Sequence, residues 1–255
     1  MVNRPASNYL DLNTPEQQRQ AAALLRWPWS PPALHALTTY FRSMEDVTTT
    51  AQLTAALTEL LGHVPPVMLD VQRELGGITL PYGWNRPLDF DLSDTGGLIE
   101  DTQSFYFAWE EAVPIWSIDA QGQIFDGKRR YCSAQQCVEW HVAIRLFALR
   151  KRMGLSYLES AMRRGTSDEA LKPSLRALAQ SLGVELDERL TDRWNLLWAS
   201  EQTQLVVHRL GNDGIDIWVH TEQLEGAEKF SSWCGANDLR INSRQRFEPP
   251  VSEEV

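Results

Sequence analysis

Residues 105–125 read FYFAWEEAVPIWSIDAQGQIF, and this stretch decides the fold that we expect for the chain. Aromatic side chains stand at every second position from Phe105 to Trp109, which places them on one face of an extended chain. The pattern continues with a second strand over 113–119, a DAQG turn and a third strand over 123–127. Because the connections between these strands are short, they predict an antiparallel meander.

Helical patterns surround the meander. Start signals, stop signals and apolar spacing predict helices over 14–26, 31–43, 50–61 and 65–77 before it and over 133–152 after it. Gly62 is expected to end the third of these helices, and Gly76 the fourth. Ser133 is expected to cap the helix that follows the meander.

The last third of the chain predicts a helix and then a second group of strands. The helix covers 167–183, and we expect a kink at Pro173. RWNLLWASE, TQLVVHRL and IDIWVHTE read as strands, with a GNDG hairpin joining the last two. EGAEKFSSWCGAN is a helix or a loop, and DLRIN is a possible final strand.

These elements predict an α+β protein, in which an antiparallel β-meander with covering helices is followed by a smaller C-terminal α+β part. We divide the chain into a helical N-terminal part over 1–60, a core over 61–153, a C-terminal part over 154–247 and a disordered tail over 248–255.

The composition is that of a globular protein, since 43% of the 255 residues are hydrophobic and 23% are charged. The first residues are polar, and no apolar run is long enough to cross a bilayer, so we expect neither a signal peptide nor a membrane span. Cys132, Cys137 and Cys234 are odd in number and sparse, which indicates reduced thiols and a cytoplasmic location.

Charge is unevenly spread over a chain whose formal net charge is −10. Residues 66–126 hold 11 acids and 2 bases, whereas residues 127–167 hold 2 acids and 9 bases. An acidic surface disfavours nucleic acid and anionic membranes and steers a basic partner, although plain solubility would also explain it. The basic runs at 150–152 and 163–164 lack interleaved aromatic residues, which favours a helix-end role over nucleic-acid binding.

Few residues have the spacing of a metal or cofactor site. Cys137 and His141 lie one helical turn apart, but zinc needs four ligands, so we expect both to be packed side chains. Asp89, Asp91 and Asp94 have the spacing of calcium ligands, yet Asp94 takes the position where an EF-hand loop needs glycine. Phosphate-loop and dinucleotide-binding motifs are absent from the sequence, and we expect no cofactor.

Two histidines leave a catalytic alternative open. His208 and His220 fall on the facing strands of the predicted hairpin, close in sequence to Asp216, and are expected to be neighbours in half-exposed strands. No nucleophile motif accompanies them. The acid pair Glu110 and Glu111 is a weaker candidate, because adjacent residues of a strand point to opposite faces.

Four segments occur in an order that resembles a known family. LGHVPPVMLDVQRELGG at 61–77 has a proline-led start and a closing glycine pair, and FAWEE at 107–111 ends a strand. VPIWSIDAQGQIF at 113–125 joins a tryptophan-bearing strand to the next one, and SAQQCVEWHVAIRLF at 133–147 is an aromatic-bearing helix. Together they resemble the SUKH superfamily, which includes many bacterial immunity proteins. The resemblance implies a protein that binds and blocks a toxin without a shared catalytic site.

The leading hypothesis is a cytoplasmic immunity protein that occludes the active site of a cognate, basic toxin domain. The sequence assigns no oligomeric state. The alternatives are an enzyme with a histidine-containing cleft between the two parts and a regulatory scaffold that recruits another protein. For the contact surface we select tryptophans and acids of the acidic segment, namely Trp84, Asp89, Asp91, Asp94, Glu100, Asp101, Trp109, Glu110 and Glu111.

Overall fold

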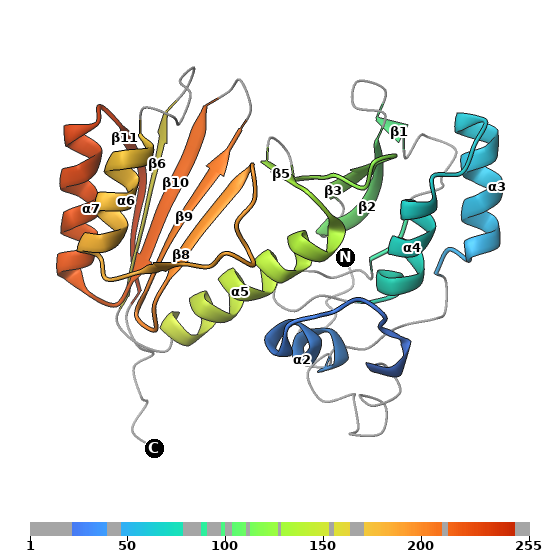
Figure 1. Ribbon diagram of the computed structural model, residues 1–255, viewed down its shortest axis with the longest axis horizontal. Coiled ribbons are helices and arrows are strands. Elements are labelled where there is room, and N and C mark those ends of the chain that lie inside the picture. Colours follow the sequence, from blue (N-terminus) through green and yellow to red (C-terminus); the bar gives the residue numbers. More distant parts are fainter. Residues whose placement is uncertain are drawn as a thin grey trace, which may run out of the picture. The chain divides into compact units, whose positions relative to one another are not determined.

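The computed structural model describes residues 22–39, 47–78, 88–90, 98–99, 104–110, 113–126, 129–152, 156–163, 171–210 and 214–247. The chain forms two compact units (Figure 1). The first unit holds Met1–Gly127 and Ser133–Ala143, and the second holds Lys128–Cys132 and Ile144–Val255. The described N-terminal helices therefore belong to the same unit as the meander, and the division falls inside the helix predicted over 133–152 rather than after residue 153.

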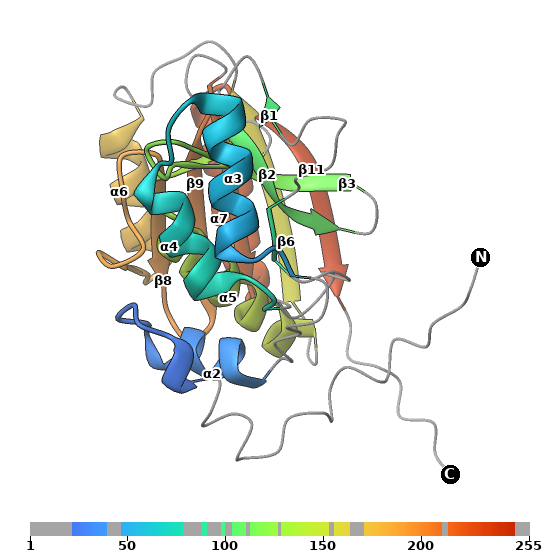
Figure 2. The ribbon, with the colours of Figure 1, turned by 90° about the vertical axis from the view of Figure 1, so that its right-hand side faces the viewer.

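The helices of the first unit are α2 (Pro31–Thr39), α3 (Thr50–Leu61) and α4 (Pro66–Leu75), and α3 and α4 lie side by side in both Figure 1 and Figure 2. Residues 40–43 of the helix predicted over 31–43 lie outside the described residues. Thr49 Oγ1 accepts a hydrogen bond from Gln52 N at 3.2 Å, while Gln52 Oε1 accepts one from Thr49 N at 2.8 Å. This reciprocal pair starts α3, and Gly62 ends it in the left-handed conformation with φ 71°. The helices predicted over 50–61 and 65–77 are confirmed.

The predicted meander is also confirmed, with one irregularity. Its strands are β1 (Leu98–Ile99), β2 (Ser104–Glu110), β3 (Val113–Asp119) and β4 (Ile124–Asp126), and each successive pair is antiparallel. In β2, Tyr106 pairs with Ser117, but Ala108 pairs with Trp116, so the register shifts at Phe107. Phe107 and Ala108 are consequently both fully buried, and the expected strict alternation of faces fails at this bulge.

The DAQG turn between β3 and β4 is held by its aspartate. Asp119 Oδ1 accepts hydrogen bonds from the backbone N–H groups of Gln121 and Gln123, each at 2.9 Å. Gly122 adopts φ 82°, a conformation that residues with a Cβ rarely take, and a Cβ there would lie 2.6 Å from Val67 Cγ2. The aspartate and the glycine therefore fix the turn locally.

The second unit is built on a six-stranded antiparallel sheet with strand order β11-β6-β10-β9-β8-β7 (Figure 1). Its strands are β6 (Ser156–Arg163), β7 (Glu185–Leu186), β8 (Asn195–Ala199), β9 (Thr203–Arg209), β10 (Ile215–Thr221) and β11 (Arg240–Phe247). The predicted strands RWNLLWASE, TQLVVHRL and IDIWVHTE are confirmed as β8, β9 and β10, and the possible strand DLRIN overlaps the start of β11. β6 was not predicted, because SYLESAMR is rich in helix-forming residues.

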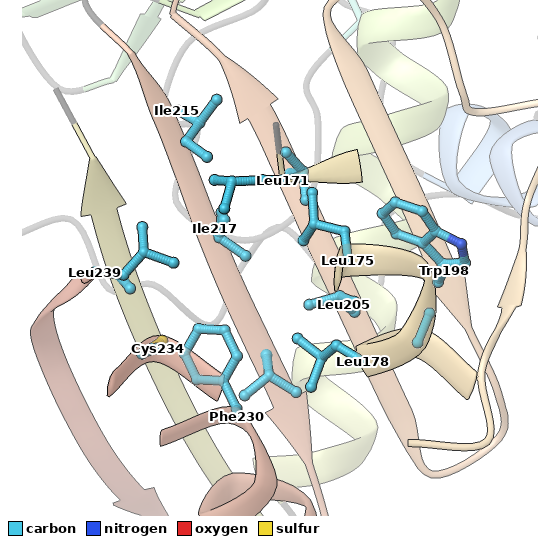
Figure 3. Close-up of a cluster of buried hydrophobic side chains, with 14 of the residues drawn as sticks. Leu171, Leu175, Leu178, Trp198, Leu205, Ile215, Ile217, Phe230, Cys234 and Leu239 are labelled. Carbon is cyan, nitrogen blue, oxygen red and sulfur yellow. The ribbon is translucent and has the colours of Figure 1, made fainter. Parts of the chain in front are cut away.

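One face of this sheet packs on two helices, α6 (Lys172–Ser181) and α7 (Leu224–Ala236). Figure 3 shows the apolar side chains that fill the space between them, with Phe230 of α7 beside Cys234 and close to the strands. Phe230 is fully buried, as are Leu205, Ile217 and Val219 of the facing strands. Burial of this apolar layer is the main term that stabilises the unit.

The kink predicted at Pro173 is wrong. The helix α6 begins at Lys172, so Pro173 lies in its first turn, where a missing N–H removes no helical hydrogen bond. Residues 167–170 of the predicted helix lie outside the described residues.

The long helix α5 (Ala134–Arg152) starts as predicted, because Ser133 Oγ accepts a hydrogen bond from Gln136 N at 3.1 Å. A short strand that was not predicted, β5 (Arg129–Tyr131), precedes it and belongs to the second unit. Cys137 and Trp140 of α5 are 1% exposed.

Gly76 should tolerate no larger side chain. A Cβ there would lie 2.4 Å from the backbone oxygen of Gln72, although the φ of −55° suits any residue. We expect Gly76→Ala to lower the free energy of unfolding by about 1–3 kcal/mol through overpacking. The matched change Gly235→Ala, where nothing lies within 4 Å of the added Cβ, should raise it by up to about 1 kcal/mol. Urea unfolding curves measure both, and equal effects would contradict the steric explanation.

Candidate functional site

The predicted contact surface lies mostly outside the described residues. This holds for Trp84, Asp91, Asp94, Glu100, Asp101 and Glu111. Trp109 and Glu110 lie in β2, with backbone described and side chains not. Asp89 is therefore the one residue of the predicted surface whose side chain the structure describes.

Asp89 is half-buried and bonded within the first unit. Its carboxylate accepts a hydrogen bond from Thr48 N at 2.9 Å and another from Gln72 Nε2 at 2.9 Å. Loss of hydration on burial raises the pKa of Asp89 above its ordinary value, and the hydrogen bonds from Thr48 and Gln72 oppose this rise. The side chain thus joins α4 to the segment that precedes α3, and no sequence pattern predicted this internal role.

Two further buried carboxylates hold the segment Arg26–Ser30, which we call the tryptophan elbow. Glu74 of α4 is 2% exposed and accepts hydrogen bonds from Arg26 N at 2.8 Å, Trp27 N at 3.0 Å and Trp29 Nε1 at 2.8 Å. Such charge-assisted bonds are about twice as strong as neutral ones. Glu74 therefore fixes the elbow on α4.

Glu139 of α5 fixes the far end of the tryptophan elbow. It is 6% exposed, and its two oxygens accept hydrogen bonds from Ser30 N at 2.7 Å and from Ser30 Oγ at 2.5 Å. Ser30 also begins α2, where its Oγ accepts a hydrogen bond from Ala33 N at 3.4 Å. The start of α2 and the position of α5 are thus linked through one serine.

The elbow can be tested by proteolysis, because trypsin cleaves after Arg26 and Glu74 binds the N–H groups on both sides of that arginine's carbonyl. We expect Glu74→Ala to speed cleavage at Arg26 by about tenfold or more, since each lost bond to a charged acceptor is worth about 1.5–3 kcal/mol. Mass spectrometry of the timed digest measures the rate. Glu59→Ala on the exposed face of α3 is the control, and equal cleavage in both variants would refute the clamp.

In the second unit, the sheet face opposite to α6 and α7 carries both histidines, but they are not neighbours. The register of β9 and β10 places Asp216 opposite His208 and Gln204 opposite His220. Trp218 lies between Asp216 and His220 on the same face of β10, and its ring is 5.2 Å from that of His208. His208 and His220 are 1% and 7% exposed, so the expectation of half-exposed neighbours is wrong.

His208 is oriented by a buried amide. His208 Nδ1 lies 2.6 Å from Asn195 Oδ1, and Asn195 Nδ2 donates to Arg130 O at 2.8 Å. Because the amide oxygen only accepts, Nδ1 carries the proton that is donated. Burial holds the pKa of His208 well below its ordinary value, and the nearby positive charge of Arg129 adds to this effect. His208 is therefore neutral at neutral pH.

Asp216 of β10 lies opposite His208, and its carboxylate binds Arg129 rather than a histidine. Its Oδ2 lies 3.0 Å from Arg129 Nη2 and accepts a hydrogen bond from Trp218 Nε1 at 3.2 Å. The Arg129 guanidinium lies over the Trp218 ring, 5.2 Å from its centroid. These contacts attach β5 to the sheet, which is a structural task.

The pair formed by His208 and Asn195 resembles part of a catalytic arrangement. In the described part of the second unit, however, no activated nucleophile accompanies it. An asparagine that orients a histidine occurs in cysteine hydrolases. The exposed thiol is Cys132, and burial together with the Asp192 carboxylate raises its pKa above the ordinary value. Ser156 Oγ lies 3.2 Å from His220 Nε2, but Ser156 is fully buried and out of reach of a substrate.

Metal binding finds no support among the described residues, where no group of three or more His, Cys, Asp and Glu side chains converges. The expected packed roles of Cys137 and His141 fit their surroundings. Cys137 is 1% exposed, burial raises its pKa well above the ordinary value, and the His141 ring meets Trp116 edge-on at 5.8 Å.

The chain matches no family model, no curated protein and no solved structure. Across the ranges that the structure describes, no helix has the length and apolar character that a bilayer span requires.

Burial of His208 should make stability depend on pH. The unfolded imidazole takes up a proton near pH 6.5 while the folded one does not, so the free energy of unfolding should fall as the pH drops below 6.5. Between about pH 7.5 and about pH 5.5 the loss from this residue should be on the order of 1 kcal/mol. Urea unfolding at both pH values should show that His208→Gln removes this part, whereas His63→Gln, at an exposed site, leaves it in place. The same pH dependence in wild type and His208→Gln would rule out the neutral buried imidazole.

Proposed function

We propose that the protein is a non-catalytic, cytoplasmic immunity protein, which binds a basic toxin domain and occludes its active site. The observation that carries the proposal is the way in which the acids of residues 66–126 are divided. Glu74, Asp89 and Asp119 accept hydrogen bonds inside the first unit, and Asp70 pairs with Arg73 on the surface of α4. Asp126 of β4 is the fifth acid of this segment whose side chain the structure describes, and it also takes part in an interaction. The six acids that we assign to the partner are the remaining ones, whose side chains lie outside the described residues, namely Asp91, Asp94, Glu100, Asp101, Glu110 and Glu111.

The hydrogen bonds of Asp89 remove this residue from the proposed contact surface. Asp89 is already bonded to Thr48 and Gln72, so its loss would damage the first unit before it affected a partner. The six remaining acids fall within a segment of net charge −9, which is a dense negative charge for so short a stretch. Charge of this density raises the rate of encounter with a basic protein at low salt.

The SUKH resemblance also supports the proposal, since its four segments coincide with α4, the strands β2 to β4 and α5. The enzyme alternative is weaker because His208 and His220 are buried and separated by Trp218. A regulatory scaffold would use the same acids and would differ only in the identity of its partner.

Charge reversal at the end of β2 tests the proposal. Tagged protein is used to capture its partner from a lysate of the source organism at low salt, and association with the purified partner is then followed by surface plasmon resonance. We expect Glu110→Lys combined with Glu111→Lys to slow association by about tenfold at low ionic strength and by less at high ionic strength.

The control is Glu201→Lys combined with Glu228→Lys, which makes the same change in net charge at two exposed positions of the second unit. It should leave association nearly unchanged. Equal slowing by both double variants would indicate a general charge effect, and unchanged association in both would exclude the proposed contact surface.

A further inference from the structure

β11 forms an outer edge of the six-stranded sheet. In the strand order it stands at one end, and among the described strands it pairs with β6 alone. Its eight residues read RINSRQRF, with three arginines and no acid. The opposite edge is β7, which has two residues and offers little backbone for pairing. The sheet therefore presents one long edge, and this edge is basic.

The backbone of β11 is held in place from both faces of the sheet. Arg244 Nη2 donates to Ser231 Oγ of α7 at 2.9 Å, and its Nε lies 3.5 Å from Glu159 Oε1 of β6. On the other face, the ring of Phe247 lies 6.0 Å from that of His220. Ile241 packs against the apolar core. A rigid edge of this kind loses little conformational entropy when another strand pairs with it.

We propose that β11 binds an extended, acidic segment of a partner protein, which adds to the sheet as an antiparallel strand. This surface lies in the second unit and goes beyond the acidic contact surface of the proposed function. Main-chain hydrogen bonds would supply affinity, and the arginines would select the charge of the partner. A second copy of β11 is a poor occupant, because pairing would bring its arginines against those of the first copy.

The register predicts where the bound segment carries an acid. Arg244 and Arg246 pair with Glu159 and Tyr157 of β6, so both side chains point to the α7 face. Arg240 pairs with Met162 and lies on the other face, beyond the register shift between Ile241 and Ser243. Because Arg244 already contacts Ser231 and Glu159, the bound segment should carry an acid on the α7 face at the position that meets Arg246.

The probe is an eight-residue peptide of alternating valine and glutamate with blocked ends and a fluorescent label. We expect saturable binding by fluorescence anisotropy. Arg246→Glu should weaken it by about fivefold or more at low salt. Arg176→Glu, at an exposed position away from β11, makes the same change in net charge and should weaken it by less than about twofold. Circular dichroism checks that each variant is folded.

Two peptide controls separate strand addition from charge attraction. Replacing each valine by proline keeps the charge but removes the N–H groups that a strand needs, so this peptide should not bind. A valine–lysine peptide should not bind either. No saturable binding of the valine–glutamate peptide, or equal binding of the proline peptide, would overturn the proposal. Dimerisation of the protein alone, lost in the β11 variant and seen by sedimentation, would identify a second copy as the occupant and would also overturn it.

Discussion

The first unit depends on a carboxylate that is buried in its interior. Glu74 of α4 is 2% exposed, and a charge so placed is costly unless donors surround it. The tryptophan elbow supplies these donors from two backbone N–H groups and one indole N–H, at 2.8–3.0 Å. The elbow and the carboxylate therefore require each other. Without the elbow the charge would be unpaired, and without the charge the elbow would have no partner for its N–H groups.

Other segments of the first unit are also bonded to α4, the helix that carries Glu74. Gln72 on the same helix donates to Thr48 O at 2.8 Å and to Asp89 at 2.9 Å, so the segments before α3 and before the meander are tied to α4 as well. Gly76 allows the close approach of the chain to Gln72. In the second unit, β5 is attached to the six-stranded sheet in a comparable way, through Asn195, His208 and Asp216. Among the described residues, the polar groups that would be candidates for chemistry thus serve the fold.

The sequence predicted the elements that depend on local signals. The helix over 50–61 follows from its apolar spacing and Gly62, and the meander follows from period-two patterning and the DAQG turn. It did not predict β6, whose strand state depends on β10 and β11 on either side of it. Nor did it predict the clamps of the tryptophan elbow, because Glu74 and Glu139 lie 48 and 109 residues away from Arg26 and Ser30. The sequence pattern did not predict the bulge at Phe107. Alternation predicts one buried face for β2, whereas the neighbours Phe107 and Ala108 are both buried.

We propose that the protein acts by occupying a partner and not by changing it. A titration of the captured partner's own activity with purified protein tests this proposal. We expect a linear loss of activity that is complete at a fixed stoichiometric ratio and is reversed when the complex is separated at high salt. Complete loss at a small fraction of that ratio would show turnover, and undiminished activity at excess protein would show that the active site is not occluded. Either result would refute inhibition by occupancy.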